Sequence, residues 1–429
     1  MDMPKSLAAV VMAGGIGTRM KSATPKHLHA LLGRRMVDWV VDAARGAGVD
    51  RVVVVASLST RELFDGVEVA VQEEPRGTGD AVRCARETLG NFGGDVLVLN
   101  GDVPALRPET IEALVETHRS AGAAATVLSF EPADAGAYGR IVRDASGALA
   151  RIVEARDASP EELALGEVNS GIYVFDAAKL WPALERLTPH NAQAELYVTD
   201  TLGILVGDGE TCAVECAEDP LEADGINTRA ELAAVAARLR DRINTEHMLA
   251  GVTIVDPTST WIDAGVAIEP DVTIHPFTVI RGEVRIASGV EIGPFASIRT
   301  LTELGPDAKV GTFVELKAAR VGARTKIPHL SYIGDAEIGE DTNIAAGNVT
   351  ANFGHVPGEP KKRTTIGSNV RTGVDNTFLA PVEIGDDTWI APGTVITENV
   401  PPGSLAGFAA RQVTKEGWVY EKHGNPDGD

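Results

Sequence analysis

The chain has 429 residues, of which 44% are hydrophobic, and its formal net charge is −22 at pH 7. This length predicts two or three domains with substantial cores. The negative charge disfavours a nucleic-acid-binding protein, because phosphate contacts need a basic surface. We find no signal peptide and no apolar run long enough to span a membrane, so we expect a cytoplasmic protein without membrane insertion. The three cysteines show no disulfide spacing, and we expect Cys212 and Cys216 to be small, buried residues of a strand.

A glycine-rich loop follows the first predicted strand. Residues 7–12 are short and apolar, as in a buried parallel strand, and positions 14–17 then contain three glycines. The backbone amides of such a loop can approach a ligand closely, and Arg19 and Lys26 place two cations nearby. The loop matches neither the dinucleotide fingerprint nor a P-loop. It suits a polyphosphate, although the glycines alone would also fit a plain structural turn.

Strand-like and helix-like segments alternate up to about Asn227, which predicts an α/β, Rossmann-like, doubly wound sheet with ligands outside the carboxyl ends of its strands. After the first strand we expect a helix at 36–47, a strand at 51–56, a helix at 79–89, a strand at 95–99 and a helix that begins at Pro108.

Two segments fall where that rule places a ligand. Residues 72–79 follow a strand and open a helix, so that Gln72 and the backbone amides could read a base edge; a helix cap with a turn is the alternative. Asp102 ends a strand at a glycine turn, which suits either a metal-binding carboxylate or an ordinary turn residue.

The pattern Gly-Gly-x-Gly-Thr-Arg-Met, with a lysine after Pro25, resembles the signature of sugar-1-phosphate nucleotidylyltransferases. Residues 7–227 as a whole resemble the uridylyltransferase half of the bacterial bifunctional UDP-N-acetylglucosamine pyrophosphorylase/glucosamine-1-phosphate N-acetyltransferase family. The resemblance implies that UTP or the UDP-sugar is bound by Ala13, Gly14, Gly15, Lys26, Gln72, Gly77, Thr78, Gly139, Glu154, Asn169 and Asn227, that Arg19 and Lys26 are catalytic, and that Asp102 and Asn227 hold Mg²⁺.

This chemistry needs no nucleophilic side chain, because a phosphate oxygen of the sugar phosphate is itself the nucleophile. The barrier is charge repulsion and alignment, which Mg²⁺, Arg19 and Lys26 would overcome. Ile16 stands where the family often has Lys, so Arg19 and Lys26 would carry more of the charge.

A long helix is predicted between the two halves of the chain. Residues 228–231 form a capping-box pattern, and Leu232, Val235, Leu239 and Ile243 recur at helical spacing up to about Leu249. Such a helix could carry the chain from one domain to the next, or it could pack on the surface of the first domain.

The C-terminal half is a repeat with a period of six. An aliphatic residue recurs every six positions from Ile262 to Leu316 and, after two five-residue steps and one longer break, up to Ile396. This period predicts a parallel β-helix and resembles the left-handed hexapeptide-repeat family. Residues 351–365 break the period and read as a loop that leaves one corner. We therefore expect domains at 1–227 and 251–429, with a helical linker at 228–250.

A histidine motif in this repeat, His329-Leu-Ser-Tyr332-Ile-Gly-Asp, matches the acetyltransferase half of the same family. By this resemblance His329 would be the general base for attack of glucosamine 1-phosphate on acetyl-CoA. The sugar phosphate would be bound by Arg299, Lys317, Tyr332, Asn343 and Asn352, and acetyl-CoA by Ala346, Val374, Pro392 and Arg411. The repeat is shorter than usual, and Val374, Pro392, Ala409 and Phe353 depart from the family pattern, mostly at the coenzyme contacts.

These observations favour a homotrimeric bifunctional enzyme that acts on UTP, N-acetylglucosamine 1-phosphate, glucosamine 1-phosphate and acetyl-CoA, and that supplies a cell-wall precursor. Two alternatives stay open at this stage. One is a sugar-1-phosphate nucleotidylyltransferase with a purely structural β-helix, and the other is a non-catalytic scaffold with the same domain plan.

Overall fold

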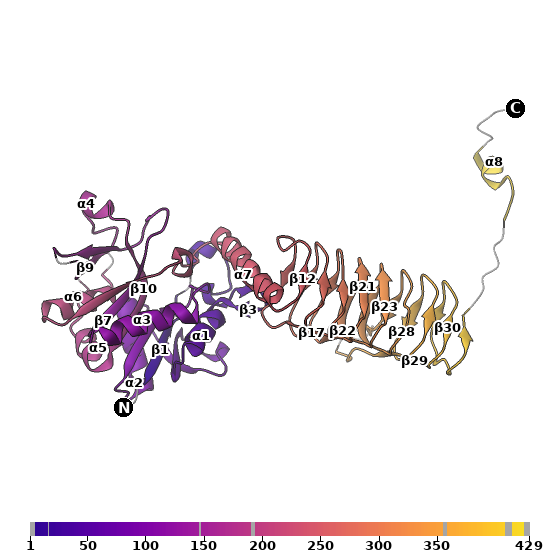
Figure 1. Ribbon diagram of the computed structural model, residues 1–429, viewed down its shortest axis with the longest axis horizontal. Coiled ribbons are helices and arrows are strands. Elements are labelled where there is room, and N and C mark those ends of the chain that lie inside the picture. The colour runs from indigo at the N-terminus through magenta and orange to yellow at the C-terminus, as the bar shows by residue number, and fades with distance from the viewer. Residues whose placement is uncertain are drawn as a thin grey trace. The chain divides into compact units, whose positions relative to one another are not determined.

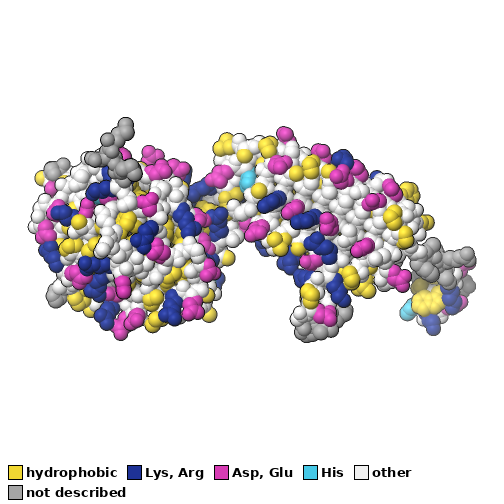
Figure 2. Space-filling view, turned by 90° about the horizontal axis from the view of Figure 1, so that it is seen from below, with side chains coloured by type: hydrophobic (Ala, Val, Ile, Leu, Met, Phe, Trp, Pro, Cys, Tyr) yellow, Lys and Arg dark blue, Asp and Glu magenta, His cyan; other side chains and the backbone are white. Residues whose placement is uncertain are grey.

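The computed structural model describes residues 5–15, 17–145, 147–189, 194–354, 358–407 and 414–423. The chain divides into two compact units, Met1–Leu239 and Arg240–Asp429, the first a mixed α/β unit and the second a stack of short strands (Figure 1). None of the helices in the described ranges is long and apolar enough to cross a membrane. On the face shown in Figure 2, basic and acidic side chains are interspersed on both units.

The first unit is built on one large sheet with the order β11-β7-β10-β6-β1-β4-β5. Its strands are β1 (Leu7–Met12), β4 (Arg51–Ser57), β5 (Glu68–Gln72), β6 (Asp95–Asn100), β7 (Ala125–Phe130), β10 (Val168–Asp176) and β11 (Cys212–Cys216), and the hairpin of β8 (Arg140–Arg143) and β9 (Leu149–Val153) attaches to β10. The short strands β2 (Ala30–Leu31) and β3 (Arg34–Arg35) pair separately. Its helices are α1 (Met36–Gly46), α2 (Thr78–Leu89), α3 (Pro108–Ser120), α4 (Pro160–Leu163), α5 (Ala177–Leu184) and α6 (Thr199–Gly207).

Strand β1 lies inside this sheet, between β6 and β4, and is buried on both sides. Leu7, Ala9 and Val11 join one core cluster with residues of α1 and α3, while Ala8 and Val10 join the other with residues of α2, α5 and α6. Because helices cover both faces, the strand is apolar throughout. The predicted strands and helices of this half are confirmed, each to within about one residue at its ends.

One feature of this unit was not predicted, and one prediction was wrong. Strand β10 runs antiparallel to both β6 and β7, so the sheet is not purely parallel. Cys212 is buried, as expected, but Cys216 at the end of β11 is exposed, because this end of the edge strand is open to solvent; the prediction was wrong for Cys216.

Helix α7 (Arg229–Leu249) carries the chain out of the first unit. Its capping box forms as predicted: the Thr228 hydroxyl accepts from the Glu231 N–H at 3.2 Å, and the Glu231 carboxylate accepts from the Thr228 N–H at 3.0 Å. Val235 and Leu239 are buried in a cluster of the first unit. In the second unit, Asn244 donates to two loop carbonyls at 2.9 and 3.0 Å. The N-terminal half of the helix therefore packs on the first unit, and the C-terminal half belongs to the second.

The second unit is a left-handed parallel β-helix whose strands pair mostly 17 or 18 residues apart, as Ile262 pairs with Ile280 and Ile280 with Ile298. The residues of the six-residue repeat point inward and are buried, except for Ile268 near the first coil, which is partly exposed. One face consists of β12 (Thr253–Ile254), β15 (Thr273–Ile274), β18 (Glu291–Ile292), β21 (Lys309–Thr312) and β23 (Lys326–His329), and further along it of β27 (Arg371–Thr372), β30 (Trp389–Ile390) and β32 (Leu405–Ala406).

The other two faces are joined by long strands that turn a corner. The second face contains β13 (Trp261–Ile262), β16 (Val279–Ile280), β19 (Ser297–Ile298), β25 (Val349–Ala351), β28 (Thr377–Leu379) and β31 (Val395–Ile396), and the third contains β14 (Ala267–Ile268), β17 (Val284–Ile286), β20 (Thr302–Leu304), β26 (Thr364–Ile366) and β29 (Val382–Ile384). Strands β22 (Glu315–Val321) and β24 (Tyr332–Ile338) belong to both. A short helix, α8 (Trp418–His423), lies near the C-terminus.

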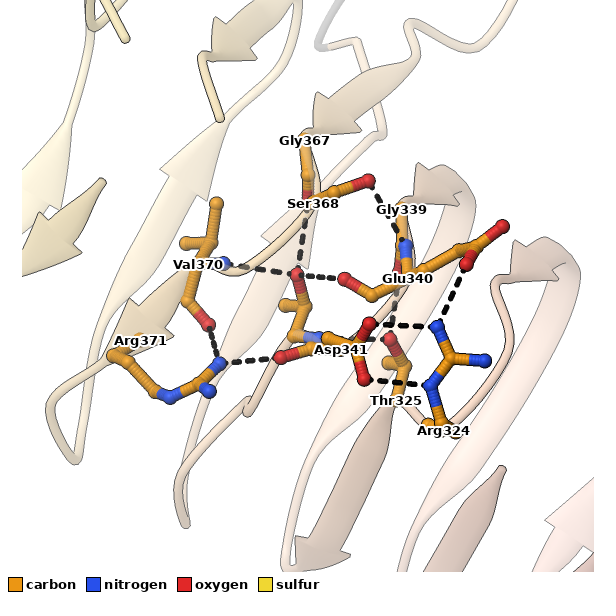
Figure 3. Close-up of polar contacts among 10 residues, drawn as sticks. Arg324, Thr325, Gly339, Glu340, Asp341, Gly367, Ser368, Val370 and Arg371 are labelled. Carbon is orange, nitrogen blue, oxygen red and sulfur yellow. Dashed lines mark hydrogen bonds and ion pairs between the residues drawn. The ribbon is translucent and has the colours of Figure 1, made fainter. Parts of the chain in front are cut away.

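Polar contacts join successive coils at the corner between the third and first faces (Figure 3). The Arg324 guanidinium donates to both carboxylate oxygens of Asp341, at 2.8 and 2.7 Å, and to Glu340 at 2.8 Å. In the next coil, the Ser368 hydroxyl accepts from the Glu340 N–H at 3.1 Å. The segment inserted after Ala351 separates the coils of Glu340 and Ser368 in the sequence. The contact between these two residues therefore joins the coils before and after the insertion, at a different corner of the β-helix.

Candidate functional site

The glycine loop connects β1 to the segment that carries the two predicted cations. Gly17 has a φ of 68°, and a Cβ atom there would collide with the side chain of Lys26, so only glycine fits. Ala13, just before the loop, is buried and donates its N–H to the Val55 carbonyl at 2.9 Å. Ile16 lies outside the described residues.

Lys26 is the centre of a polar cluster at the carboxyl ends of β1 and β6. Its ammonium group contacts the carboxylate of Asp102 and donates to Asn227 Oδ1 at 3.1 Å. Arg19 donates to the same Asn227 oxygen at 2.8 Å. The Asn227 amide is oriented by its Nδ2, which donates to the Gly225 carbonyl at 3.3 Å. The fold therefore brings Arg19, Lys26, Asp102 and Asn227 together from distant parts of the sequence.

Asp102 and Asn227 fit the requirements of a magnesium ion. Each presents a hard oxygen toward the same cation, here the Lys26 ammonium, and Mg²⁺ is usually bound by one or two such oxygens together with water and substrate phosphates. In the ranges that the structure describes, no group of three or more His, Cys, Asp or Glu side chains could form an all-protein metal cage.

A cleft of about 710 Å³ opens beside this cluster. It is lined by most of the predicted nucleotide-binding residues: Gly14, Gly15, Arg19, Lys26, Gln72, Gly77, Thr78 and Asn227. Gly77 has a φ of 113°, and a Cβ there would meet the backbone of Leu196, which explains why glycine stands at the entrance to α2.

A smaller pocket of about 220 Å³ shares Met12, Thr78 and Asn100 with this cleft and contains three predicted sugar-binding residues, Gly139, Glu154 and Asn169. Burial raises the pKa of the Glu154 carboxyl, whose oxygen accepts from the Thr199 hydroxyl at 3.4 Å. The Asn169 amide exchanges hydrogen bonds with the buried Tyr173 hydroxyl at 2.8 and 3.0 Å. The predicted nucleotide-binding and sugar-binding residues therefore line two adjoining cavities.

Tyr138 and Asp224 were not assigned a role from the sequence. The Tyr138 hydroxyl donates to Asp224 at 2.6 Å and connects the segment before the β8–β9 hairpin to the loop that leads to Asn227. Burial, with the Asp224 carboxylate, raises the pKa of this tyrosine. The sequence Tyr-Gly-Arg at 138–140 could have drawn attention to Tyr138, but its partner Asp224 lies 86 residues further along the chain.

The second predicted site lies on the β-helix. Arg299 and Lys317 stack on neighbouring strands of the second face, since the Arg299 N–H donates to the Leu316 carbonyl at 2.8 Å. The Arg299 guanidinium is paired with Glu315 at 2.7 Å. In the next coil, Gly334 pairs with Lys317, and a Cβ at Gly334 would collide with the Tyr332 hydroxyl and lie 2.7 Å from Asn352 Nδ2. Arg299, Lys317, Tyr332 and Asn352 are thus grouped on one face.

Lys361, at the end of the inserted loop, joins this group, and the sequence did not single it out. The neighbouring amine of Lys361 lowers the pKa of Lys317, because two ammonium groups side by side repel each other. Asp335 lies 3.9 Å from Lys361 and accepts a hydrogen bond from the Asn352 amide. Two adjacent ammonium groups beside a guanidinium form a site that suits a phosphate dianion.

His329 and Asn343 lie away from this group within a single chain. His329 ends β23 and is exposed at the corner between the first and second faces. Asn343 pairs with Lys326 and Arg371 on the first face. Among the described residues we find no hydrogen bond between Asn352 and His329. Within one chain, the residues predicted to bind glucosamine 1-phosphate and to act as the general base therefore lie in three places: the group around Arg299, the corner with His329, and Asn343 on the first face.

Ala346, Val374 and Pro392 occupy the same corner in successive coils. The Asp375 N–H donates to the Ala346 carbonyl at 2.9 Å, and the Gly393 N–H donates to the Val374 carbonyl at 2.8 Å. Val374 is exposed. The stack places the three predicted coenzyme-binding positions in a line. Arg411 and Ala409 lie outside the described residues.

Comparisons with known proteins agree with both units. Residues 9–198 match the MobA-like NTP transferase domain, and residues 265–300 match the bacterial transferase hexapeptide (six repeats). The chain is 44% identical to Bifunctional protein GlmU of Streptomyces coelicolor, over 98% of this chain and 96% of that protein. It is 43% identical to GlmU of Corynebacterium glutamicum strain R, over 97% and 94% of the two chains, and 41% identical to GlmU of Mycobacterium bovis, over 99% and 95%. At this identity over nearly its whole length, the chain belongs to the GlmU family of bifunctional proteins.

Proposed function

We propose that the chain synthesises UDP-N-acetylglucosamine, a precursor of peptidoglycan and lipopolysaccharide, in two reactions. The first transfers an acetyl group from acetyl-CoA to glucosamine 1-phosphate, and the second transfers a uridylyl group from UTP to the product and releases pyrophosphate. The observation that carries the proposal is the Arg19–Lys26–Asp102–Asn227 cluster at the mouth of a nucleotide-sized cleft, in a chain that continues into a hexapeptide β-helix.

In uridylyl transfer, a phosphate oxygen of N-acetylglucosamine 1-phosphate attacks the α-phosphorus of UTP, and the bond to the β-phosphate oxygen breaks. Mg²⁺, when bound at Asp102 and Asn227, adds positive charge beside the phosphates. Arg19 and Lys26 neutralise the negative charge of the triphosphate, and the loop amides align it. Gly139, Glu154 and Asn169 hold the sugar in the adjoining pocket.

In acetyl transfer, the amine of glucosamine 1-phosphate attacks the thioester carbonyl of acetyl-CoA. His329 takes a proton from the amine, and the coenzyme A thiolate leaves. We assign the sugar phosphate to Arg299, Lys317 and Lys361, because three cations meet there. Tyr332, Asn343 and Asn352 bind the sugar.

We assign the coenzyme to the corner formed by Ala346, Val374 and Pro392, together with Arg411. Pro392 has no N–H to offer, and Val374 presents no polar group, so we expect acetyl-CoA to be held loosely while the turnover that depends on His329 is kept.

We further propose that the protein is a cytoplasmic homotrimer. Phe277, Phe295 and Phe313 form a stacked ridge on the corner beside His329, with ring centroids 4.8 and 5.1 Å apart. The three rings are 46–57% exposed, and Leu330 continues the ridge at 61%. An exposed apolar stripe of this length favours burial against another copy. The neighbouring copy would then supply the groups that one chain does not bring to His329. We place the domains at 1–227 and 251–429, with the linker at 228–250.

The test measures the two half-reactions separately on the full chain. We expect pyrophosphate release with UTP and N-acetylglucosamine 1-phosphate, and free coenzyme A with glucosamine 1-phosphate and acetyl-CoA. Substitution of His329 by Ala should abolish only the second reaction. Absence of acetyl transfer at millimolar acetyl-CoA would favour a nucleotidylyltransferase with a structural β-helix, and absence of both activities would favour a scaffold.

A further inference from the structure

Asp80 is a buried carboxylate at the edge of the nucleotide cleft, and nothing above gives it a role. It lies in the first turn of α2 and is 6% exposed. One of its oxygens accepts from Gln72 Nε2 at 2.9 Å, and the other accepts from the Arg83 guanidinium at 2.5 Å. Asp80 therefore connects a surface arginine to the side chain that faces the base-binding end of the cleft.

These contacts fix which way the Gln72 amide points. Gln72 Nε2 also donates to the Gly77 carbonyl at 3.1 Å. A carboxylate and a carbonyl can only accept hydrogen bonds, so the NH₂ group of Gln72 must face them. Its carbonyl oxygen then faces the other way. This oxygen lies over the glycine loop, 3.3 Å from where a Cβ on Gly14 would stand, and among the described residues no hydrogen bond reaches it.

An acceptor fixed at this place selects among nucleobases. Uracil presents the N3–H donor of its imide, which a carbonyl oxygen can bind. Cytosine has an unprotonated N3, so two acceptors would face each other and the Gln72 oxygen would lose its partner. Sites built for a donor reject analogues that lack it, because the buried group is left unpaired.

We propose that Asp80, anchored by Arg83, is a positioning residue that sets the base specificity of uridylyl transfer, by holding the carbonyl of Gln72 toward the imide N–H of uracil. The inference rests on the proposed function of this cleft. An acidic residue in the first turn of a helix also stabilises the helix dipole, but that role alone would not alter the preference between two bases.

Asp80→Asn is the sharpest test. The Arg83 guanidinium can only donate, so it retains the oxygen of the substituted amide and turns the new NH₂ group toward Gln72. The Gln72 amide then loses one of the two acceptors that fix its orientation and faces a donor in its place, while the Gly77 carbonyl remains. We expect the ratio of kcat/KM for UTP to that for CTP to fall about tenfold or more. The ratio for UTP against dTTP should stay within about twofold, because thymine carries the same imide N–H. Arg83→Ala, on a partly exposed side chain, should shift the UTP/CTP ratio in the same direction by less.

Glu185→Gln provides a matched control, because Glu185 is paired with Arg86 of the same helix at 3.0 Å and does not line the cleft. It should leave both ratios unchanged. Melting temperature and the acetyl-transfer rate report whether each variant is folded. A proportional loss of UTP and CTP activity in folded Asp80→Asn, or an unchanged UTP/CTP ratio in both Asp80→Asn and Arg83→Ala, would overturn the inference. A wild-type chain that forms no UDP-sugar from UTP would instead refute the proposed function.

Discussion

Lys26 shows how one side chain connects the parts of the nucleotide site. Its ammonium group contacts Asp102 after β6 and Asn227 before α7, while its stem fills the space that Gly17 leaves free. The cation is therefore held in place before substrate arrives, and preorganised charge of this kind is worth most in a transition state that spreads negative charge.

We predict that Lys26→Ala and Asp102→Ala each reduce UDP-sugar formation by about 100-fold or more, the size expected when a preorganised electrostatic group is removed. Acetyl transfer should be unaffected, because its residues lie on the β-helix. The measurement is pyrophosphate release at saturating Mg²⁺, with coenzyme A release as the control. A near-wild-type rate in either variant would remove that residue from the site.

His27, next to Lys26, predicts a pH dependence of stability. The side chain is 6% exposed, and burial is the main reason that its pKa is lowered from 6.5 to about 4; Asp102 raises the pKa and Lys26 lowers it. Protonation therefore opposes folding, and the wild type should lose stability as the pH falls from about 6.5 to 4.

His27→Gln removes this titration. Relative to the wild type, the variant should become more stable by up to about 3 kcal/mol on going from pH 7 to pH 4. Urea unfolding in buffer without divalent cations measures the difference at pH 7, 5.5 and 4. Parallel pH profiles for the two proteins would contradict the prediction.

At the scale of elements, helix α7 contributes to both units. Its N-terminal half buries apolar residues of the first unit, and its C-terminal half holds the first turn of the β-helix through Asn244, which is fully buried. The first turn of the β-helix is therefore capped by the side-chain amide of Asn244 rather than by another coil.

Asn244→Ala should destabilise the second unit by about 1–3 kcal/mol, because two carbonyls, that of Thr260 buried and that of Pro257 partly buried, lose their donor. Hydrogen exchange should increase first in residues 253–280, while the first unit keeps its protection. Thr245→Ala is the matched control, since its hydroxyl donates to the Asp241 carbonyl of the same helix, at 2.7 Å, on the exposed side. Equal effects of both substitutions would contradict this assignment.

The periodicity of the sequence predicted the elements well. The six-residue period placed the inward residues of the β-helix correctly, because each of them must be buried in a narrow interior. The period did not reveal the first strand, Thr253–Ile254, or the last, Leu405–Ala406, because the ends of a repeat carry too few apolar residues to extend it. The direction of β10 was also not predictable, since strand pairing depends on contacts far apart in sequence.

The site was predicted less completely than the fold. Arg19, Lys26, Asp102 and Asn227 were identified and lie together. Asp80 was missed because an acidic residue in the first turn of a helix is common, and its bond to Gln72 depends on how α2 packs against the end of β5. Asn343 pairs with Lys326, three residues before His329 on the first face, and a motif does not show which residues of successive coils pair.

At the scale of the whole molecule, the exposed ridge of Phe277, Phe295 and Phe313 predicts the oligomeric state. Phe295→Asp should dissociate the trimer, because a charge would then be buried among apolar side chains. Light scattering at micromolar concentration measures the mass, and acetyl transfer should fall together with it while uridylyl transfer is kept. Leu63→Asp, at a 49% exposed position of the first unit, is the control. A wild-type monomer would refute the trimer.

The corner that carries Ala346, Val374 and Pro392 would present backbone groups to a ligand at a regular spacing. Neighbouring strands are about 4.8 Å apart, so each further coil moves the corner by one such increment and presents the next backbone carbonyl or amide at a constant pitch. An extended ligand bound along this corner, such as the pantetheine arm of coenzyme A, would meet a backbone carbonyl or amide at each coil. Removing one coil would therefore shorten this binding surface by about 4.8 Å and leave the spacing of the remaining coils unchanged.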